Sequence, residues 1–382
     1  MPSQTRVFLT VFLDLIGFGI VLPLLPSYGA RFTGNAALIG ALVATDSLLT
    51  FLLAPKWGRL SDRIGRRPVL LIGLAGSAVS YLVFGLAGSF AMLLFSRIVS
   101  GATGATVHVA QAYLADITPP ERRSHAMGLI GAAFGLGFTI GPAIGGSASL
   151  YGDALPGLIA SGIAAANFFL ALATLPETEV RRRPEYRPLT RSWIRFRSPF
   201  GVMFASTLAF TAIYVSFPLY SQDVLGYGRS AVSSFFVVIG LITIVVQGRL
   251  VGRLAPRFGE RRLVITGSAL MAAGFALFPM IARSTGGLLA AIALLTTGFC
   301  LVGPSLAGLV SRRTARDEQG GTLGMLQSAG AIARIIGPPA AGFLGQVAGP
   351  AAPFYAAAGA AVIAAAAGSV QSAEEAVPAD LA

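Results

Sequence analysis

The sequence is poor in charge, in histidine and in cysteine. Only 12% of its 382 residues are charged, about half of the roughly 25% usual in soluble domains. The single cysteine, Cys300, lies in an apolar run, so no intrachain disulfide is possible. No Ser-His-Asp arrangement, metal-spaced His/Cys set or G-x-x-x-x-G-K phosphate loop occurs. We therefore expect no enzyme activity, no cofactor and no metal site.

Long apolar runs dominate what remains, since 54% of the residues are hydrophobic and the mean hydropathy is +0.74. Runs of about 20 residues can cross a bilayer as helices, and the strand alternation of an outer-membrane barrel is absent. The first run lacks a clear cleavage site, so we interpret it as a retained span and not a signal peptide. The sequence predicts twelve spans: 6–27, 36–57, 68–88, 90–114, 124–150, 154–175, 199–220, 230–251, 263–283, 286–310, 321–345 and 351–371.

The distribution of arginine predicts the orientation of these spans. The net charge of +12 could suggest nucleic-acid binding, but the basic residues lie in loops between spans, so we exclude that function. With the N-terminus inside, 23 of 28 basic residues fall on the inner side, and only Arg31, Arg229 and Arg283 fall in outer loops. By the positive-inside rule, we expect a multi-pass protein of the inner membrane with both termini cytoplasmic.

One long loop divides the spans into two sets of six. We expect an N-terminal bundle over 1–175, a basic linker over 176–198 and a C-terminal bundle with a short tail over 199–382. The linker contains Arg181, Arg182 and Arg183, so we expect it to lie on anionic inner-leaflet lipids. A regulatory role of the linker is the alternative.

The chain repeats a short segment that we expect to form a hinge between spans two and three. Residues 58–67 read GRLSDRIGRR, and residues 252–262 read GRLAPRFGERR, with both glycines displaced by 194 positions. The simplest interpretation is a basic loop whose only role is to fix the orientation of the spans in the membrane. The repeat instead favours two parallel six-helix halves, which is an architecture of secondary transporters.

These motifs resemble those of the major facilitator superfamily. Residues 58–67 fit its signature loop, G-x-L-x-D-R-x-G-R-[KR], and residues 97–104 resemble its R-x-x-x-G-x-x-G element. Residues 137–146 are similar to the antiporter motif G-x-x-x-G-P-x-x-G-G, and residues 14–26 are similar to span one of tetracycline/proton antiporters. The resemblance implies an all-α membrane protein with twelve transmembrane helices in two six-helix bundles.

The resemblance also implies a conformational gate and an antiporter motif. It pairs Asp116 with Arg66, and we expect Asp62 to meet the N-terminal end of span eleven, where the helix dipole favours a carboxylate. The second repeat has Pro256 in place of Asp62, so only the first copy supplies that charge. The expected gate residues are Gly58, Asp62, Arg63, Gly65, Arg66, Arg67 and Asp116, and the motif residues are Gly137, Gly141, Pro142, Gly145 and Gly146.

Ionisable residues inside spans are costly and are therefore candidates for function. Asp14 and Asp46 lie near mid-depth, and Arg97 lies in span four. A carboxylate whose partner distance changes between two conformations can load and release a proton, although either acid could simply be a structural partner. Arg97 is an expected partner of a carboxylate, and we expect His108, eleven residues later, to share its helix face.

Further polar residues could contact a substrate. The candidates for the substrate cavity are His108, Gln111, Gln327 and Arg334, and Asn167 and Gln247 are left open. We expect a monomeric secondary active transporter that exports amphipathic small molecules, such as drugs, in exchange for protons, with a role in antibiotic resistance. The alternatives are a sugar or metabolite permease of the same fold and a non-transporting membrane sensor.

Overall fold

A computed structural model describes residues 3–104, 106–118, 123–177, 197–314 and 319–374. Every regular element in these ranges is a helix. The N-terminal half contains α1 (Ser3–Val21), α2 (Leu25–Gly29), α3 (Ala36–Ile64), α4 (Arg66–Gly85), α5 (Phe90–Thr103), α6 (Thr106–Ile117), α7 (Arg123–Ala148) and α8 (Ala154–Thr174). The C-terminal half contains α10 (Arg197–Thr211), α11 (Ile213–Asp223), α12 (Arg229–Val245), η2 (Val246–Leu250), α13 (Val251–Phe258), α14 (Glu260–Ile281), α15 (Thr285–Arg312), α16 (Gln319–Ala348) and α17 (Ala352–Glu374).

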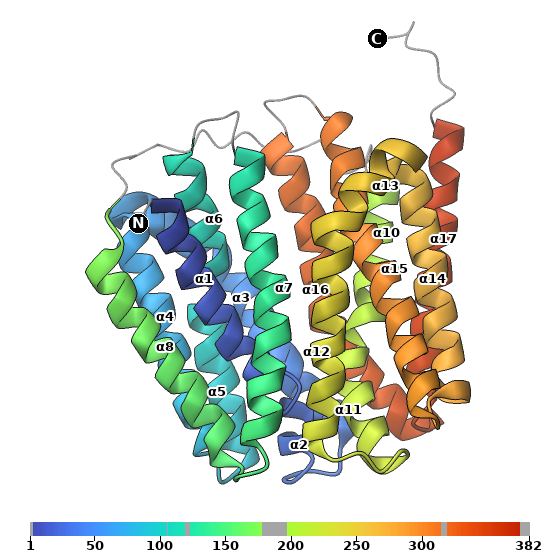
Figure 1. Ribbon diagram of the computed structural model, residues 1–382, viewed down its shortest axis with the longest axis horizontal. Coiled ribbons are helices and arrows are strands. Elements are labelled where there is room, and N and C mark those ends of the chain that lie inside the picture. The colour runs from blue at the N-terminus through green and yellow to red at the C-terminus, as the bar shows by residue number, and fades with distance from the viewer. Residues whose placement is uncertain (1–2, 105, 119–122, 178–196, 315–318, 375–382) are drawn as a thin grey trace, which may run out of the picture.

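The two halves form two helix bundles that stand side by side, coloured blue to green and yellow to red in Figure 1. Eleven segments of the described chain are long and apolar enough to cross a membrane. The twelfth expected span, 321–345, falls in α16, which has 30 residues and contains Pro338 and Pro339. The all-helical fold expected from the sequence is confirmed. The linker residues 178–196 lie outside the described residues.

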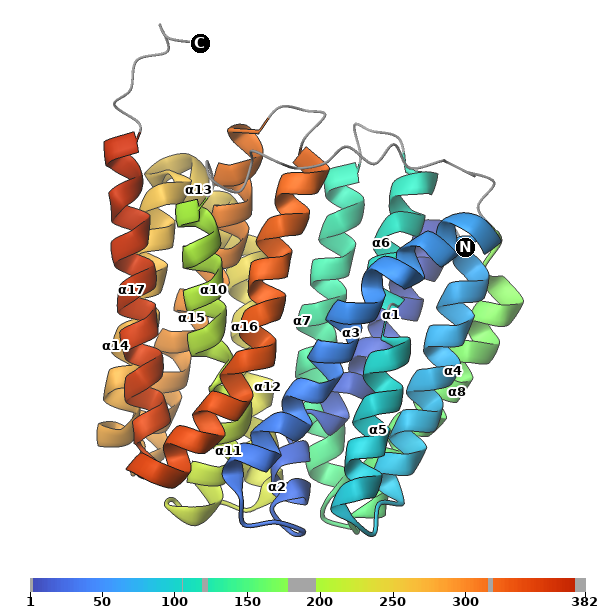
Figure 2. The same ribbon diagram turned by 180° about the vertical axis from the view of Figure 1, so that it is seen from behind.

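Both ends of the described chain lie at one end of the molecule (Figure 1). The C-terminal end of α3, with Arg59 and Arg63, lies at this same end, which we call the basic end. The loop between α7 and α8 and the loop between α11 and α12 lie at the other end, which we call the opposite end (Figures 1 and 2).

Several expected spans are broken helices. The first divides into α1 and α2, the fourth is interrupted after Thr103, and the seventh is interrupted at Ala212. Span eight contains the π-helical turn η2 before it continues as α13. The sequence pattern, which predicts each span as one continuous helix, did not reveal these breaks.

The segment 58–67 was expected to be a ten-residue hinge, and this expectation is wrong. Helix α3 continues to Ile64, and the chain turns at Gly65 alone, whose φ of 102° favours glycine. Gly259 takes the same role between α13 and α14 with a φ of 80°. The repeat in the sequence is therefore a repeat of a one-residue joint between two helices.

The two bundles touch at close crossings near the opposite end. At Gly40 of α3, an added Cβ would lie 2.2 Å from the carbonyl oxygen of Pro338 on α16. At Gly342, an added Cβ would lie 2.0 Å from the carbonyl oxygen of Ala36. Helices α3 and α16 therefore meet backbone to backbone here, and they diverge toward the basic end (Figure 2).

A second crossing joins α7 to α12. A Cβ at Gly146 would lie 2.6 Å from the Cβ of Ser233, and one at Gly240 would lie 2.4 Å from the Thr139 hydroxyl oxygen. Val215 of α11 is fully buried in an apolar cluster made otherwise from the N-terminal bundle. The opposite end is therefore the place where the bundles share a core.

Candidate functional site

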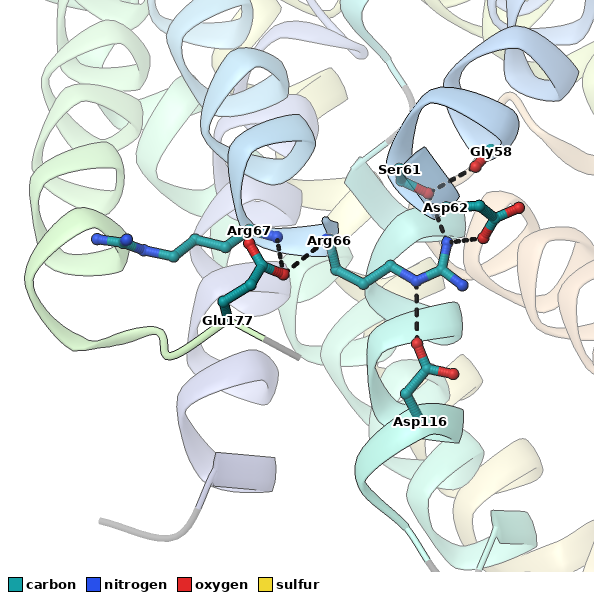
Figure 3. Close-up of polar contacts among 7 residues, drawn as sticks. All are labelled: Gly58, Ser61, Asp62, Arg66, Arg67, Asp116 and Glu177. Atoms are coloured by element: carbon teal, nitrogen blue, oxygen red, sulfur yellow. Dashed lines mark hydrogen bonds and ion pairs between the residues drawn. The ribbon is translucent and has the colours of Figure 1, made fainter. Parts of the chain in front are cut away.

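Arg66 is the centre of an ion-pair network at the basic end (Figure 3). Its guanidinium lies 2.6 Å from Asp62, one turn earlier, and 3.0 Å from Asp116 at the end of α6. It also donates a hydrogen bond of 2.5 Å to the Ser61 hydroxyl, which in turn donates to the carbonyl of Gly58. The Arg66 side chain is only 12% exposed, so the network ties α3, α4 and α6 together.

The start of α4 is held by a residue that the sequence analysis did not predict. The Glu177 carboxylate accepts hydrogen bonds from the backbone N–H groups of Arg66, at 2.8 Å, and Arg67, at 3.3 Å. A carboxylate here satisfies orphan donors and complements the helix dipole. A Cβ at Gly65 would lie 2.5 Å from the Glu177 carboxyl carbon, so glycine is required for space as well as for φ. The only signal in the sequence was an acid directly after span six.

The expected contact of Asp62 with the N-terminal end of span eleven stays a prediction, because residues 315–318 lie outside the described residues. Asp62 of α3 pairs across the Gly65 joint with Arg66 of α4. Arg63 is exposed and has no polar partner among the described residues. Arg67 instead donates to the carbonyl of Leu172 on α8, at 2.6 Å. The gate contacts seen here lie within the N-terminal bundle.

In the second repeat, an arginine still bonds the start of the helix to a neighbouring helix, and the described residues show no ion-pair network like that around Arg66. Arg261, 194 residues after Arg67, donates to the carbonyls of Gly368 and Ser369 on α17, at 3.4 and 2.6 Å. Asp62 is replaced by Pro256 in α13, and Glu260 pairs instead with Arg312, at 2.5 Å. Among the described residues, the C-terminal bundle therefore has the same helix anchor without a match to the Asp62–Arg66–Asp116 ion pairs at the joint.

Inside the N-terminal bundle, Arg97 of α5 is buried, with 2% of its surface exposed. Its guanidinium donates to the hydroxyls of Ser80, at 3.1 Å, and Ser96, at 3.2 Å, and lies 5.7 Å from the ring centre of Phe84. No carboxylate oxygen lies within 4.0 Å of it in the described chain. Asp46 acts on Arg97 through its charge without a direct ion pair.

Asp14 and Asp46 lie close enough to interact electrostatically. Ser77 donates a hydrogen bond of 3.0 Å to Asp14, and Ser100 bonds to Asp46. Both carboxylates are half-buried, so they remain reachable. We call Asp14, Asp46, Ser77, Tyr81 and Arg97 the polar cluster, since Tyr81 bonds to Ser77 and interacts with all three charges. The sequence analysis found the three charged members and missed Ser77 and Tyr81, which lie one turn apart on α4.

The expectation that His108 shares a helix face with Arg97 stays a prediction. The span is divided between the two residues into α5 and α6. Arg97 is buried, whereas His108 and Gln111 are exposed on α6. The charge of Arg334, on α16 of the other bundle, acts on His108.

The expected cavity residues of α16 lie on one exposed face. Gln327 and Arg334 are two turns apart and both are exposed. Together with His108 and Gln111 they form what we call the interbundle face, because the electrostatic contact between Arg334 and His108 joins the two bundles. Asn167 is buried and donates to the carbonyl of Thr10, so it is a packing residue.

The antiporter motif forms contacts between helices. Gly137, Gly141 and Gly145 of α7 pack against α1, and a Cβ at Gly141 would lie 2.7 Å from the backbone of Gly19. Gly146 packs against α12, as described above. Helix α7 continues through Pro142 without a break. The motif therefore sets how closely α7 approaches α1 and the second bundle.

An ion-pair cluster that the sequence analysis did not predict joins the bundles at the opposite end. Asp153, before α8, pairs with Arg229 of α12 and, at 2.6 Å, with Arg31. Tyr28 donates a hydrogen bond of 2.6 Å to the carbonyl of Asp153. Burial, reinforced by the charge of Asp153, raises the pKa of Tyr28 to about 12, so its hydroxyl remains a donor at neutral pH.

We call Tyr28, Arg31, Asp153 and Arg229 the clasp. A further bond between the bundles runs from the Gln222 amide to the Ser27 hydroxyl. The few charges in these loops were the only signal available in the sequence. The described ion pairs at the basic end each lie within one bundle, so the clasp is what distinguishes the two ends.

Two bundles of membrane-spanning helices, with a closed end and ionisable groups between and within them, define a secondary transporter. The chain belongs to the Major Facilitator Superfamily, whose sequence profile matches residues 7–255 and 248–376. It is 32% identical over 348 residues to the tetracycline resistance protein of class E from Escherichia coli, covering 87% of this chain and 85% of that protein.

Two further similarities extend over most of the chain. It is 28% identical to multidrug resistance protein 2 of Bacillus subtilis (strain 168), over 87% of this chain and 86% of that protein. The crystal structure of the human organic anion transporter MFSD10 superposes with a TM-score of 0.74 at 27% identity, covering 96% of this chain and all of that one. The expected family and fold are therefore confirmed.

Proposed function

We propose that this protein exports amphipathic small molecules, such as drugs, in exchange for protons by alternating access. The observation that carries the proposal is the polar cluster, which places two reachable carboxylates beside a buried arginine inside one bundle. Ionisable groups at this depth in a membrane protein mark ion pathways.

The charges of the cluster suggest how it handles a proton. With Asp14 and Asp46 both ionised, Arg97 balances one negative charge and leaves the other unbalanced. One bound proton makes the cluster neutral, which is favourable away from bulk water. Arg97 is fixed by two serine hydroxyls, so the carboxylates and not the arginine are the groups whose partners would change during the cycle.

The relatives support export of a drug. The similar proteins from Escherichia coli and Bacillus subtilis are named for resistance to tetracycline and to multiple drugs, which argues against the rival interpretation as a sugar or metabolite permease. None of the three similar proteins is named as a sensor, so the non-transporting alternative gains no support from them.

Orientation, surroundings and assembly are part of the proposal. The inner side predicted from the arginines coincides with the basic end, so we place that end and both termini in the cytoplasm, in the bacterial inner membrane. In this orientation, the clasp closes the protein to the outside, and the protein faces inward. We further propose two bundles, 1–175 and 199–382, a linker, 176–198, on anionic lipids, and a monomer.

Purified protein in liposomes tests this function directly. With an imposed pH gradient, addition of tetracycline or another drug from a panel should cause proton movement coupled to drug movement in the opposite direction. A panel of sugars should cause none. Drug flux that is indifferent to the proton gradient would contradict proton coupling, and sugar-driven flux would support the permease.

A further inference from the structure

Arg334 is a cation between the two bundles, without an ion-pair partner in the described part of the chain. It lies half-way along α16 (Gln319–Ala348), it is exposed, and it makes no hydrogen bond or ion pair with any described residue. An unpaired guanidinium at mid-depth in a membrane protein is costly and normally finds an anionic partner. The protein itself supplies none in the described chain.

The neighbours of Arg334 do not compensate its charge. Its guanidinium lies against Gly330, with a nitrogen 3.5 Å from where a Cβ of that residue would be. The groups that interact with it electrostatically are the side chains of Tyr214, on α11, and His108, on α6, and neither is a carboxylate. Neither acid of the polar cluster acts on Arg334, so the cation and the acids occupy separate places.

Tyr214, which interacts with this cation, belongs to a group of aromatic side chains. Tyr214 packs edge to face on Phe210, at 5.9 Å between ring centres, and Phe210 stacks on Phe299 at 3.9 Å. Tyr214 and Phe299 are half-buried, so part of their surface is free. A flat ring system could pack on this surface while an acidic group attached to it reaches the guanidinium.

We propose that Arg334 binds the anionic group of the transported molecule, so that the substrates are organic anions with an aromatic or conjugated body. This inference rests on the proposed export function and adds the charge of the substrate to it. In this proposal, Gln327, two turns earlier on the same face of α16, and Gln111, exposed on α6, donate further hydrogen bonds to the anion. Arginine suits this role because its planar fork matches a carboxylate with two parallel hydrogen bonds.

The test measures binding to purified protein in detergent, without a gradient. The probes are aromatic carboxylic acids, each paired with its methyl ester, which keeps the ring and removes the charge. The wild-type protein should bind the acids at least tenfold more tightly than the esters. Arg334→Gln should abolish this preference, Arg334→Lys should keep part of it, and Gln327→Ala should lower the affinity for the acids while keeping the preference.

The outcomes separate the inference from the function. A wild-type protein that binds esters as well as acids overturns the anion site, even if Arg334→Gln fails to fold. An unchanged preference in a folded Arg334→Gln protein also overturns it. If drugs without an anionic group are exported against the proton gradient, the function stands and the anion site falls. If the acids bind through Arg334 but no proton moves, the anion site stands and proton-coupled export falls.

Discussion

Asp153 of the N-terminal bundle and Arg229 of the C-terminal bundle form an ion pair that holds the two bundles together at the opposite end. The Asp153 side chain is 42% exposed and that of Arg229 is 31% exposed, so water screens the pair and each such contact is worth about 0.2–1 kcal/mol. The pair is strong enough to bias two conformations and weak enough to break in every cycle.

Asp153→Asn should therefore shift the protein toward the conformation that is open at this end, by about 1 kcal/mol or a factor of about five in population. Spin labels at Leu150 and Val224, which are both exposed and belong to different bundles, would report a larger share of long distances. The measurement requires Cys300→Ser to remove the native thiol.

Arg31→Gln is the matched control for the clasp. Arg31 also pairs with Asp153, but it belongs to the same bundle, so its loss should leave the distance distribution unchanged. An equal shift in both variants would mean that Asp153 acts on its own bundle and not across the interface.

Glu177→Ala should destabilise the N-terminal bundle. The substitution removes a carboxylate that accepts from two N–H groups at the start of α4, and loss of such a cap costs about 0.5–2 kcal/mol. The expected result is a lower midpoint of thermal unfolding in detergent. Asp223→Asn, at an exposed position of the other bundle, should leave the midpoint unchanged. A Glu177→Ala protein as stable as the wild type would contradict the role of the cap.

Asp14→Asn should abolish uphill transport driven by a pH gradient. The cluster then carries one carboxylate opposite Arg97 and has no unbalanced charge for a proton to neutralise. Downhill exchange of substrate should survive, since the shape of the side chain is nearly unchanged. Flux measured in liposomes with and without the gradient separates the two modes.

Two companion variants identify which acid carries the proton. Asp46→Asn removes the other carboxylate of the pair, and Ser77→Ala removes only the hydrogen bond to Asp14, so it should shift the pH profile of transport without abolishing coupling. A well-expressed Asp14→Asn protein that still concentrates substrate would assign the proton to Asp46 or His108.

The topology is tested by reporter fusions. A reporter after Pro188 should be cytoplasmic and a reporter at Gly152 should be external, because basic residues gather on the side of the linker. Finding both reporters on the same side of the membrane would contradict the predicted arrangement of the spans.

The fold was predictable from the sequence because its signals are local. Apolar runs of spanning length, the Gly58–Arg67 repeat and the arginine-rich loops each act within one segment. The charged members of the polar cluster were also predictable, since Asp14, Asp46 and Arg97 are conspicuous in apolar surroundings.

The partners of these residues were less predictable, because they depend on helix breaks and on packing over long separations. Arg97 and His108 lie on two separate helices, α5 and α6, although the sequence predicts one continuous span. Glu177 reaches a helix start more than a hundred positions earlier, and Asp153 meets Arg229 across the interface between bundles. No pattern in a single segment encodes such pairs, and serine hydroxyls that hold an arginine are too common to stand out.

The crossing of α3 and α16 at Gly40 and Gly342 has a consequence for how the protein tolerates change. Here two backbones close on each other with no room for a methyl group. The larger side chain in Gly40→Val would force α3 and α16 apart at this end, far from the proposed proton site and the proposed substrate site. The most damaging small substitutions should therefore include positions that touch no ligand, and a Gly40→Val variant should be a practical means to trap the form that is open at this end for structure determination.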